Sequence, residues 1–102
     1  MSLSYTKKSA KFAESIHLGT ITFSTTWSGS DPYSQVVTVT GANVTSNSKV
    51  DLQPDALQIT QLSSDGVNTL MIENDDGVLT AWALGAVNTS SMTIQCTVTE
   101  LG

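Results

Sequence analysis

The sequence predicts an all-β protein, an antiparallel β-sandwich of the immunoglobulin-like or jelly-roll-like kind, with about six to seven strands and one short helix. Apolar and polar residues alternate over several short stretches, which is the period of a half-buried strand. Clusters of Gly, Ser, Asp and Pro separate these stretches. The chain of 102 residues also holds 14 Ser and 15 Thr, and threonine suits a pleated surface because its Cβ is branched. One compact domain with one core accounts for this length.

The N-terminal residues differ from the rest of the chain. We assign residues 1–19 to a leader or linker, part helical or disordered, and residues 20–102 to the β-sandwich domain. Phe12 and Ile16 are four residues apart, a spacing that allows one or two helical turns over residues 9–16, although so short a helix is marginal alone. Gly19 is predicted to mark the start of the folded body.

The first two strands are predicted on either side of a long loop. Residues 20–26 alternate, with Ile21 and Phe23 on one face. Residues 27–33 are dense in turn-forming types, and residues 33–40 alternate again. This order predicts a hairpin with a long loop between its strands.

A short strand and the single helix follow. Residues 42–48 are polar and predicted to form a loop, and residues 49–53 a short strand. Pro54 at the first helical position, an acid in the first turn and Gly66 after the end are helix start and stop signals. They predict one short helix between Pro54 and Gly66.

The C-terminal part predicts a tight hairpin and a last strand. Residues 67–73 and 78–84 are strands, and the sequence Asn-Asp-Asp-Gly at 74–77 is the turn between them, since Asp-Gly between apolar strands is a strong hairpin signal. Carboxylates also bind Ca²⁺, so Asp75 and Asp76 are an alternative cation site, although the spacing does not fit an EF-hand loop. Residues 92–100 alternate strictly, which predicts the last strand and places Cys96, the only cysteine, in the core.

Charge excludes one large class of partners. The chain has no arginine, and three of its four lysines lie before residue 12. Residues 12–102 contain nine acidic residues against Lys49 alone, a formal charge of −8. Nucleic-acid binding needs cations to replace phosphate counterions, so we expect no nucleic-acid partner. No apolar run reaches the length of a membrane span and no apolar segment follows Lys7 and Lys8, so we expect neither membrane insertion nor secretion by a signal peptide.

Catalytic and cofactor signals are weak. His17 is the only histidine and has no nucleophile motif near it, and no glycine pattern predicts a phosphate-binding loop. We therefore expect no enzyme, no cofactor and no metal. Trp82 lies between two alanines in a strand and is expected in the core. The possible contact surface consists of Trp27, Asp31 and Tyr33, which border the long loop.

The stretch from Trp27 to Gly41 resembles small β-domains of tailed-phage and prophage virion appendages, such as tail fibres and baseplates, in the pattern W-x-G-x-x-P-Y-x-Q-x-V-x-V-x-G. Parallels continue at residues 50–52, at residues 65–67 and in the last strand. The resemblance implies a structural or host-contact module without catalysis, often in homotrimers, that contacts other virion proteins. It implies a virion location after synthesis in the bacterial cytoplasm, and it supplies no binding residues.

We therefore predict a virion-associated assembly or host-attachment module that forms homo-oligomers. The alternative is a carbohydrate-binding module, for instance for a cell-surface glycan, that uses exposed aromatic side chains at Trp27 and Tyr33. A hydrolase with an unrecognised site around His17 is the third hypothesis.

Overall fold

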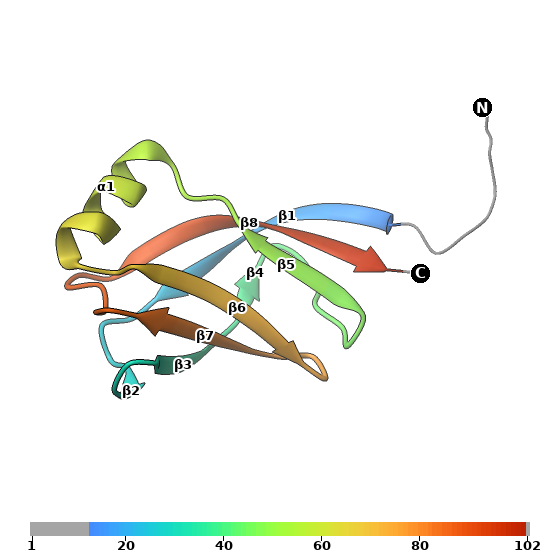
Figure 1. The fold of residues 1–102 in the computed structure, drawn as a ribbon. Coiled ribbons are helices and arrows are strands. Elements are labelled where there is room, and N and C mark those ends of the chain that lie inside the picture. The colour runs from blue at the N-terminus through green and yellow to red at the C-terminus, as the bar shows by residue number, and fades with distance from the viewer. Residues whose placement is uncertain (1–12, 102) are drawn as a thin grey trace.

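The computed structural model describes residues 13–101, which form two antiparallel four-stranded sheets packed face to face (Figure 1). The strands of sheet A lie in the order β4-β1-β8-β5. Their bounds are Ala13–Phe23 for β1, Val39–Thr40 for β4, Ser48–Leu52 for β5 and Met92–Leu101 for β8.

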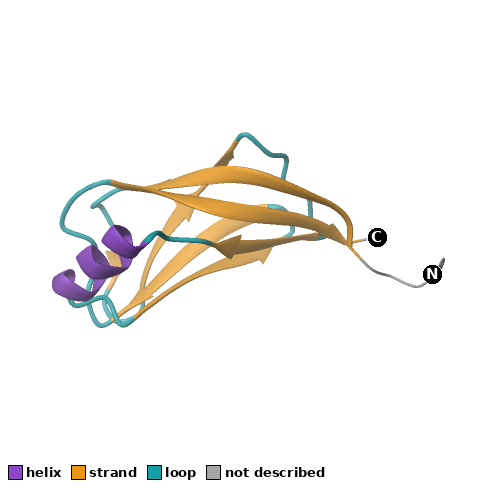
Figure 2. Cartoon of the chain, turned by 90° about the horizontal axis from the view of Figure 1, so that it is seen from above, coloured by secondary structure: helices purple, strands orange, loops and turns teal. Residues whose placement is uncertain are grey.

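The strands of sheet B lie in the order β2-β3-β7-β6. Their bounds are Ser28–Gly29 for β2, Tyr33–Val37 for β3, Thr69–Asp75 for β6 and Val78–Leu84 for β7. Helix α1 (Ala56–Asp65) connects β5 to β6 and lies at one end of the two sheets (Figure 2). The predicted sandwich with one short helix is confirmed. Its six longer strands correspond to the six stretches expected from the alternation, while β2 and β4 contain two residues each.

The hydrophobic core lies between the sheets and follows the alternation along each strand. Ile21 and Phe23 of β1 face Leu79 and Ala81 of β7 across this core, and all four are almost completely buried. Cys96 is fully buried beside them, as predicted, and burial raises the pKa of its thiol. The thiol is therefore a small core side chain.

Strand β1 corrects the prediction for the N-terminal region. It begins at Ala13 and pairs with β8 from there to Phe23. The helical turns predicted over residues 9–16 therefore do not form at residues 13–16, and residues 1–12 lie outside the described part. Backbone pairing with β8 outweighs the weak local helical preference. Gly19 is not a boundary either: it is buried in the strand, and a Cβ there would lie 2.5 Å from Cγ1 of Val39.

The single strand predicted over residues 33–40 is two strands in different sheets. β3 pairs with β7 in sheet B, and after Thr38 the chain passes to sheet A, where β4 pairs with β1 at Thr20 and Ile21. The predicted hairpin between residues 20–26 and 33–40 is thus limited to the short antiparallel pairing of β4 with β1, and it is wrong for β3. Val37 is buried and Val39 also packs against the core. The alternation of apolar and polar residues therefore continues through the change of sheet, so the sequence pattern does not reveal where the chain leaves sheet B.

Helix α1 ends where the sequence signals predict, but it begins two residues later than expected, at Ala56. Asp55 is the N-cap: its Oδ1 accepts from the Gln58 backbone N at 2.8 Å, and Gln58 Oε1 accepts from the Asp55 backbone N at 3.0 Å. Pro54 therefore precedes the cap and is not the first helical residue. Gly66 ends the helix with a left-handed φ of 88°.

The predicted turn between β6 and β7 is confirmed in its place, but it is shorter than expected because β6 continues to Asp75. Asp75 pairs with Val78, and the two residues between them, Asp76 and Gly77, have φ values of 54° and 92°. Two positive φ angles are the requirement of a type I′ hairpin turn. The Asn74 side chain supports the turn, because its Oδ1 accepts from Gly77 N at 2.8 Å.

Glu100 in β8 has a lowered pKa. The Thr45 hydroxyl donates to one carboxylate oxygen and the Ser48 hydroxyl to the other, at 2.7 Å for Ser48. These two hydrogen bonds, with a smaller contribution from the charge of His17, hold the pKa of Glu100 below its ordinary value of 4.5. The ionised carboxylate therefore links the loop before β5 to the end of β8.

We expect Glu100→Gln to flatten the loss of stability in acid. Because the folded pKa is below the unfolded one, the stabilisation is fully present above pH 4.5 and is lost as pH falls through the folded pKa. Urea unfolding between pH about 3 and about 6 measures this slope. Asp51→Asn, which removes an exposed carboxylate from β5, is the control. An unchanged slope in Glu100→Gln would contradict the assignment.

Candidate functional site: a groove on the outer face of sheet B

The outer face of sheet B is more apolar than a solvated sheet face usually is. The register of β6 and β7 places Met71 opposite Trp82 and Thr69 opposite Leu84 on this face. The alternate β7 residues, including Ala81 and Ala83, face the core. Met71 and Leu84 are 49% and 40% exposed. Since antiparallel sheets normally present polar residues to water, these side chains indicate a contact surface.

Trp82 corrects the prediction that it belongs to the core. It is half-buried on the outer face, whereas its neighbours Ala81 and Ala83 are at most 1% exposed on the inner face. Both faces of β7 are apolar, so alternation alone could not assign the faces. The alanines occupy the inner positions, where the facing sheet leaves room for a small side chain.

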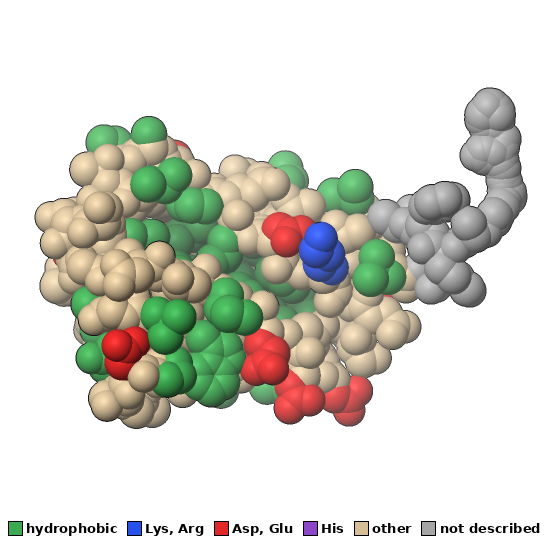
Figure 3. Space-filling view, in the orientation of Figure 1, with side chains coloured by type: hydrophobic (Ala, Val, Ile, Leu, Met, Phe, Trp, Pro, Cys, Tyr) green, Lys and Arg blue, Asp and Glu red, His purple; other side chains and the backbone are tan. Residues whose placement is uncertain are grey.

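Trp82 lines an open groove with a volume of about 410 Å³. Its indole Nε1 donates to Glu73 Oε1 at 2.9 Å, and this hydrogen bond restricts the orientation of the ring. Figure 3 shows the apolar side chains as a continuous green area. The residues that line the groove are Pro32, Thr69, Met71, Glu73, Trp82 and Leu84.

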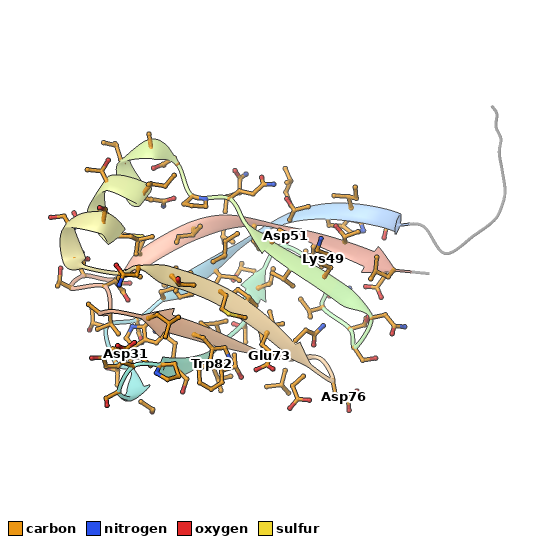
Figure 4. The ribbon with its side chains drawn as sticks, in the orientation of Figure 1. Asp31, Lys49, Asp51, Glu73, Asp76 and Trp82 are labelled. Atoms are coloured by element: carbon orange, nitrogen blue, oxygen red, sulfur yellow. The ribbon has the colours of Figure 1, made fainter. Side chains whose placement is uncertain are left out.

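Acidic side chains border the groove on both sides (Figure 3). Glu73 lies beside Trp82 and Asp76 lies beyond it at the β6–β7 turn, while Asp31 lies on the opposite side, next to Pro32 (Figure 4). Lys49 is the only lysine among residues 13–101 and belongs to β5 of the other sheet, 3.8 Å from Asp51. The groove therefore has an apolar floor and negative borders.

The three residues predicted as a contact surface have different surroundings. The Trp27 ring stacks on Phe23 with a centroid distance of 6.3 Å, and its Nε1 donates to Asn88 Oδ1 at 2.8 Å. Tyr33 is half-buried and pairs with Ala83, so it lies on the inner side of β3. Asp31 is exposed, and its Oδ1 accepts from Gly85 N at 3.0 Å. Trp27 and Tyr33 thus do not share the outer face with Trp82.

His17 was the candidate for catalysis, and Asp75 and Asp76 were the candidates for cation binding. His17 is exposed in β1 and lines a hollow of about 500 Å³ with Val39, Gly41, Ala42 and Asn43, none of which is a nucleophile or a carboxylate. Beside Asp75 and Asp76, the side-chain oxygen of Asn74 already accepts a hydrogen bond from the Gly77 backbone N. Within residues 13–101, no three His, Cys, Asp or Glu side chains are grouped so that they could hold a metal ion.

The fold and the groove define a small antiparallel β-sandwich with an exposed apolar surface on one sheet. Comparison with family models, with curated proteins and with solved structures finds no match for this chain. Over the part of the chain that the structure describes, no helix has the length and apolar character needed to cross a membrane.

Proposed function

We propose that this protein is a non-catalytic contact module of the kind from which phage and prophage virion appendages are assembled, and that its contacts form through the groove on sheet B. The observation that carries the proposal is the exposed apolar surface around Trp82. The resemblance over residues 27–41 supports the type of assembly. The first partner of such a module is another copy of the same chain, because virion appendages are symmetric oligomers.

The groove has the properties of a binding hot spot. Tryptophan and methionine are enriched in the centres of protein interfaces. The hydrogen bond to Glu73 holds the Trp82 ring in place before binding, which lowers the entropy cost of association. Val36 and Val78, 69% and 55% exposed on the same face, extend the apolar area beyond the groove.

We expect Trp82→Thr to weaken self-association by about tenfold or more, because the variant removes the central aromatic side chain of the contact. Threonine keeps the preference for strand, and only the half-buried ring is lost, so the free energy of unfolding should fall by about 1 kcal/mol. Sedimentation velocity over a wide range of protein concentration measures the association.

The matched control is Leu18→Thr, which removes an apolar side chain, 62% exposed, from sheet A. This variant should associate like the wild type. Equal weakening in both variants, or a wild-type chain that stays monomeric and binds no virion protein through this face, would contradict the proposal.

Carbohydrate binding is the second candidate function, and the structure favours Trp82 over Trp27 as its platform. Trp82 lies on an outer face beside a carboxylate, whereas one ring face and the indole N–H of Trp27 are engaged within the fold. Protein contact is preferred because sugars need several hydrogen bonds, and only Thr69 and Glu73 line the groove with polar side chains. A glycan array with hits that Trp82→Thr abolishes would favour sugar binding.

A further inference from the structure

We propose that the groove on sheet B binds the basic N-terminal segment, residues 1–12, of a second copy of this chain. The inference rests on the proposed contact function of the groove and names its occupant. It follows from the charge, the side-chain types and the length of this segment, matched to the residues that surround Trp82.

Charge is the first match. Residues 1–12 contain Lys7, Lys8 and Lys11 and no acidic residue, a formal charge of +3 without the terminal amine. Residues 13–101 contain nine acidic residues and one lysine. The groove lies between Asp31 on one side and Glu73 and Asp76 on the other (Figure 4). A basic segment is therefore attracted to both borders of the groove.

Side-chain type is the second match. The same segment contains Leu3, Tyr5 and Phe12, which are apolar or aromatic. The groove offers Met71 and Leu84 for apolar contact and the Trp82 ring for a lysine ammonium group. A segment with lysines and apolar residues interspersed thus suits a groove with an apolar floor and acidic borders.

Length is the third match. Twelve residues in extended conformation span at most about 40 Å. The part of β6 that lines the groove, from Thr69 to Glu73, is about 15 Å long in a strand. The segment is therefore long enough to cross the groove and to leave several residues as a connection to β1 of its own copy.

The position of β1 favours a groove on another copy. β1 belongs to sheet A, and the groove lies on the outer face of sheet B, on the opposite side of the sandwich. Within one molecule the segment would have to turn round the end of the sandwich to reach that face. Each copy has one segment and one groove, so two copies that exchange segments satisfy both grooves in a closed dimer.

A charge swap in the full-length chain tests the proposal. The segment variant carries Lys7→Glu, Lys8→Glu and Lys11→Glu, and the groove variant carries Glu73→Lys and Asp75→Lys, two exposed positions on the outer face of β6. Each variant alone should self-associate about tenfold or more weakly than the wild type. A mixture of the two should associate again, because the acidic segment of one copy then meets the basic groove of the other.

Two further measurements separate this contact from other effects of charge. Lys49→Glu makes the same type of change on sheet A and should leave self-association unchanged. A synthetic peptide of residues 1–12, added to the segment variant, whose groove is unchanged and not filled by its own altered segment, should shift the NMR signal of the Trp82 indole N–H. The indole N–H of Trp27, bonded to Asn88, should keep its position.

The remaining outcomes decide between the two proposals. A mixture that stays monomeric overturns this inference, and so does a chain with both sets of changes that stays monomeric, since its segment and groove then do not join two copies. If Trp82→Thr weakens association while the segment variant and the peptide have no effect, the proposed function holds and this inference fails. If none of these changes has an effect, both fail.

Discussion

Asn88→Ala is expected to lower the free energy of unfolding by about 2–4 kcal/mol, because it removes the buried side chain at the centre of a hydrogen-bond network. Asn88 is 3% exposed in the loop between β7 and β8. Its Oδ1 accepts from Trp27 Nε1 at 2.8 Å, and its Nδ2 donates to the backbone oxygens of Ser24 at 3.2 Å and Ser90 at 2.9 Å. One side chain thus joins the stretch after β1, which holds Ser24 and Trp27, to the loop before β8.

The expected loss of stability is large because the substitution leaves the hydrogen-bonding partners of Asn88 in place. Alanine leaves the Trp27 N–H and the two carbonyl oxygens without this partner, next to a position that is itself buried. The stacking of Trp27 on Phe23 should loosen as well, because the ring loses its anchor. Urea unfolding monitored by tryptophan fluorescence measures both changes.

Asn43→Ala is the matched control for this network. Asn43 is exposed in the loop after β4, so the same change there should alter stability by less than about 0.5 kcal/mol. A similar loss in the two variants would show that Asn88 does not hold the network together.

Gly85→Ala is expected to destabilise the fold by about 2–5 kcal/mol, through backbone conformation and crowding together. Gly85 has a φ of 91° directly after β7. A Cβ at this position would lie 2.6 Å from Asn68 Nδ2 and 2.7 Å from the backbone oxygen of Gly66. The backbone of Gly66 caps α1 and cannot move without disturbing the end of the helix.

Gly77→Ala separates the two contributions. Gly77 has nearly the same φ, 92°, but a Cβ there would meet no atom closer than 3.9 Å. This variant should show only the conformational cost, about 1–2 kcal/mol. Thermal and urea unfolding of the two variants provide the comparison, and equal losses would contradict a role for crowding at Gly85.

Local signals predicted the elements whose geometry depends on a few neighbouring residues. The turn at Asp76 and Gly77 follows from the positive φ angles that a two-residue hairpin needs, and aspartate and glycine tolerate them. The end of α1 follows in the same way from Gly66, whereas its start is set by the Asp55 cap and not, as predicted, by Pro54. Strand β8 was predicted because one of its faces is buried and the other is polar, so the alternation has a single interpretation.

The candidate site was only partly predictable. The sequence singled out Trp27, Asp31 and Tyr33 because they border a polar loop, yet Trp27 has a partner, Asn88, 61 residues away. Trp82 was assigned to the core because both of its neighbours are small and apolar. The excess of acidic residues was visible in the composition, but the position of Glu73 beside Trp82 depends on the pairing of β6 with β7.

The sequence by itself determined the fold class, the tight hairpin, the helix and the excess of negative charge, because each depends on local conformational preference or on composition. Only the tertiary structure decided that β1 begins at Ala13, that residues 33–40 divide between two sheets, and that Trp82 faces outward. These three features depend on which strands pair and which face the second sheet covers. Such contacts join residues far apart in the chain, and they override local preference because pairing and burial act over the whole sheet.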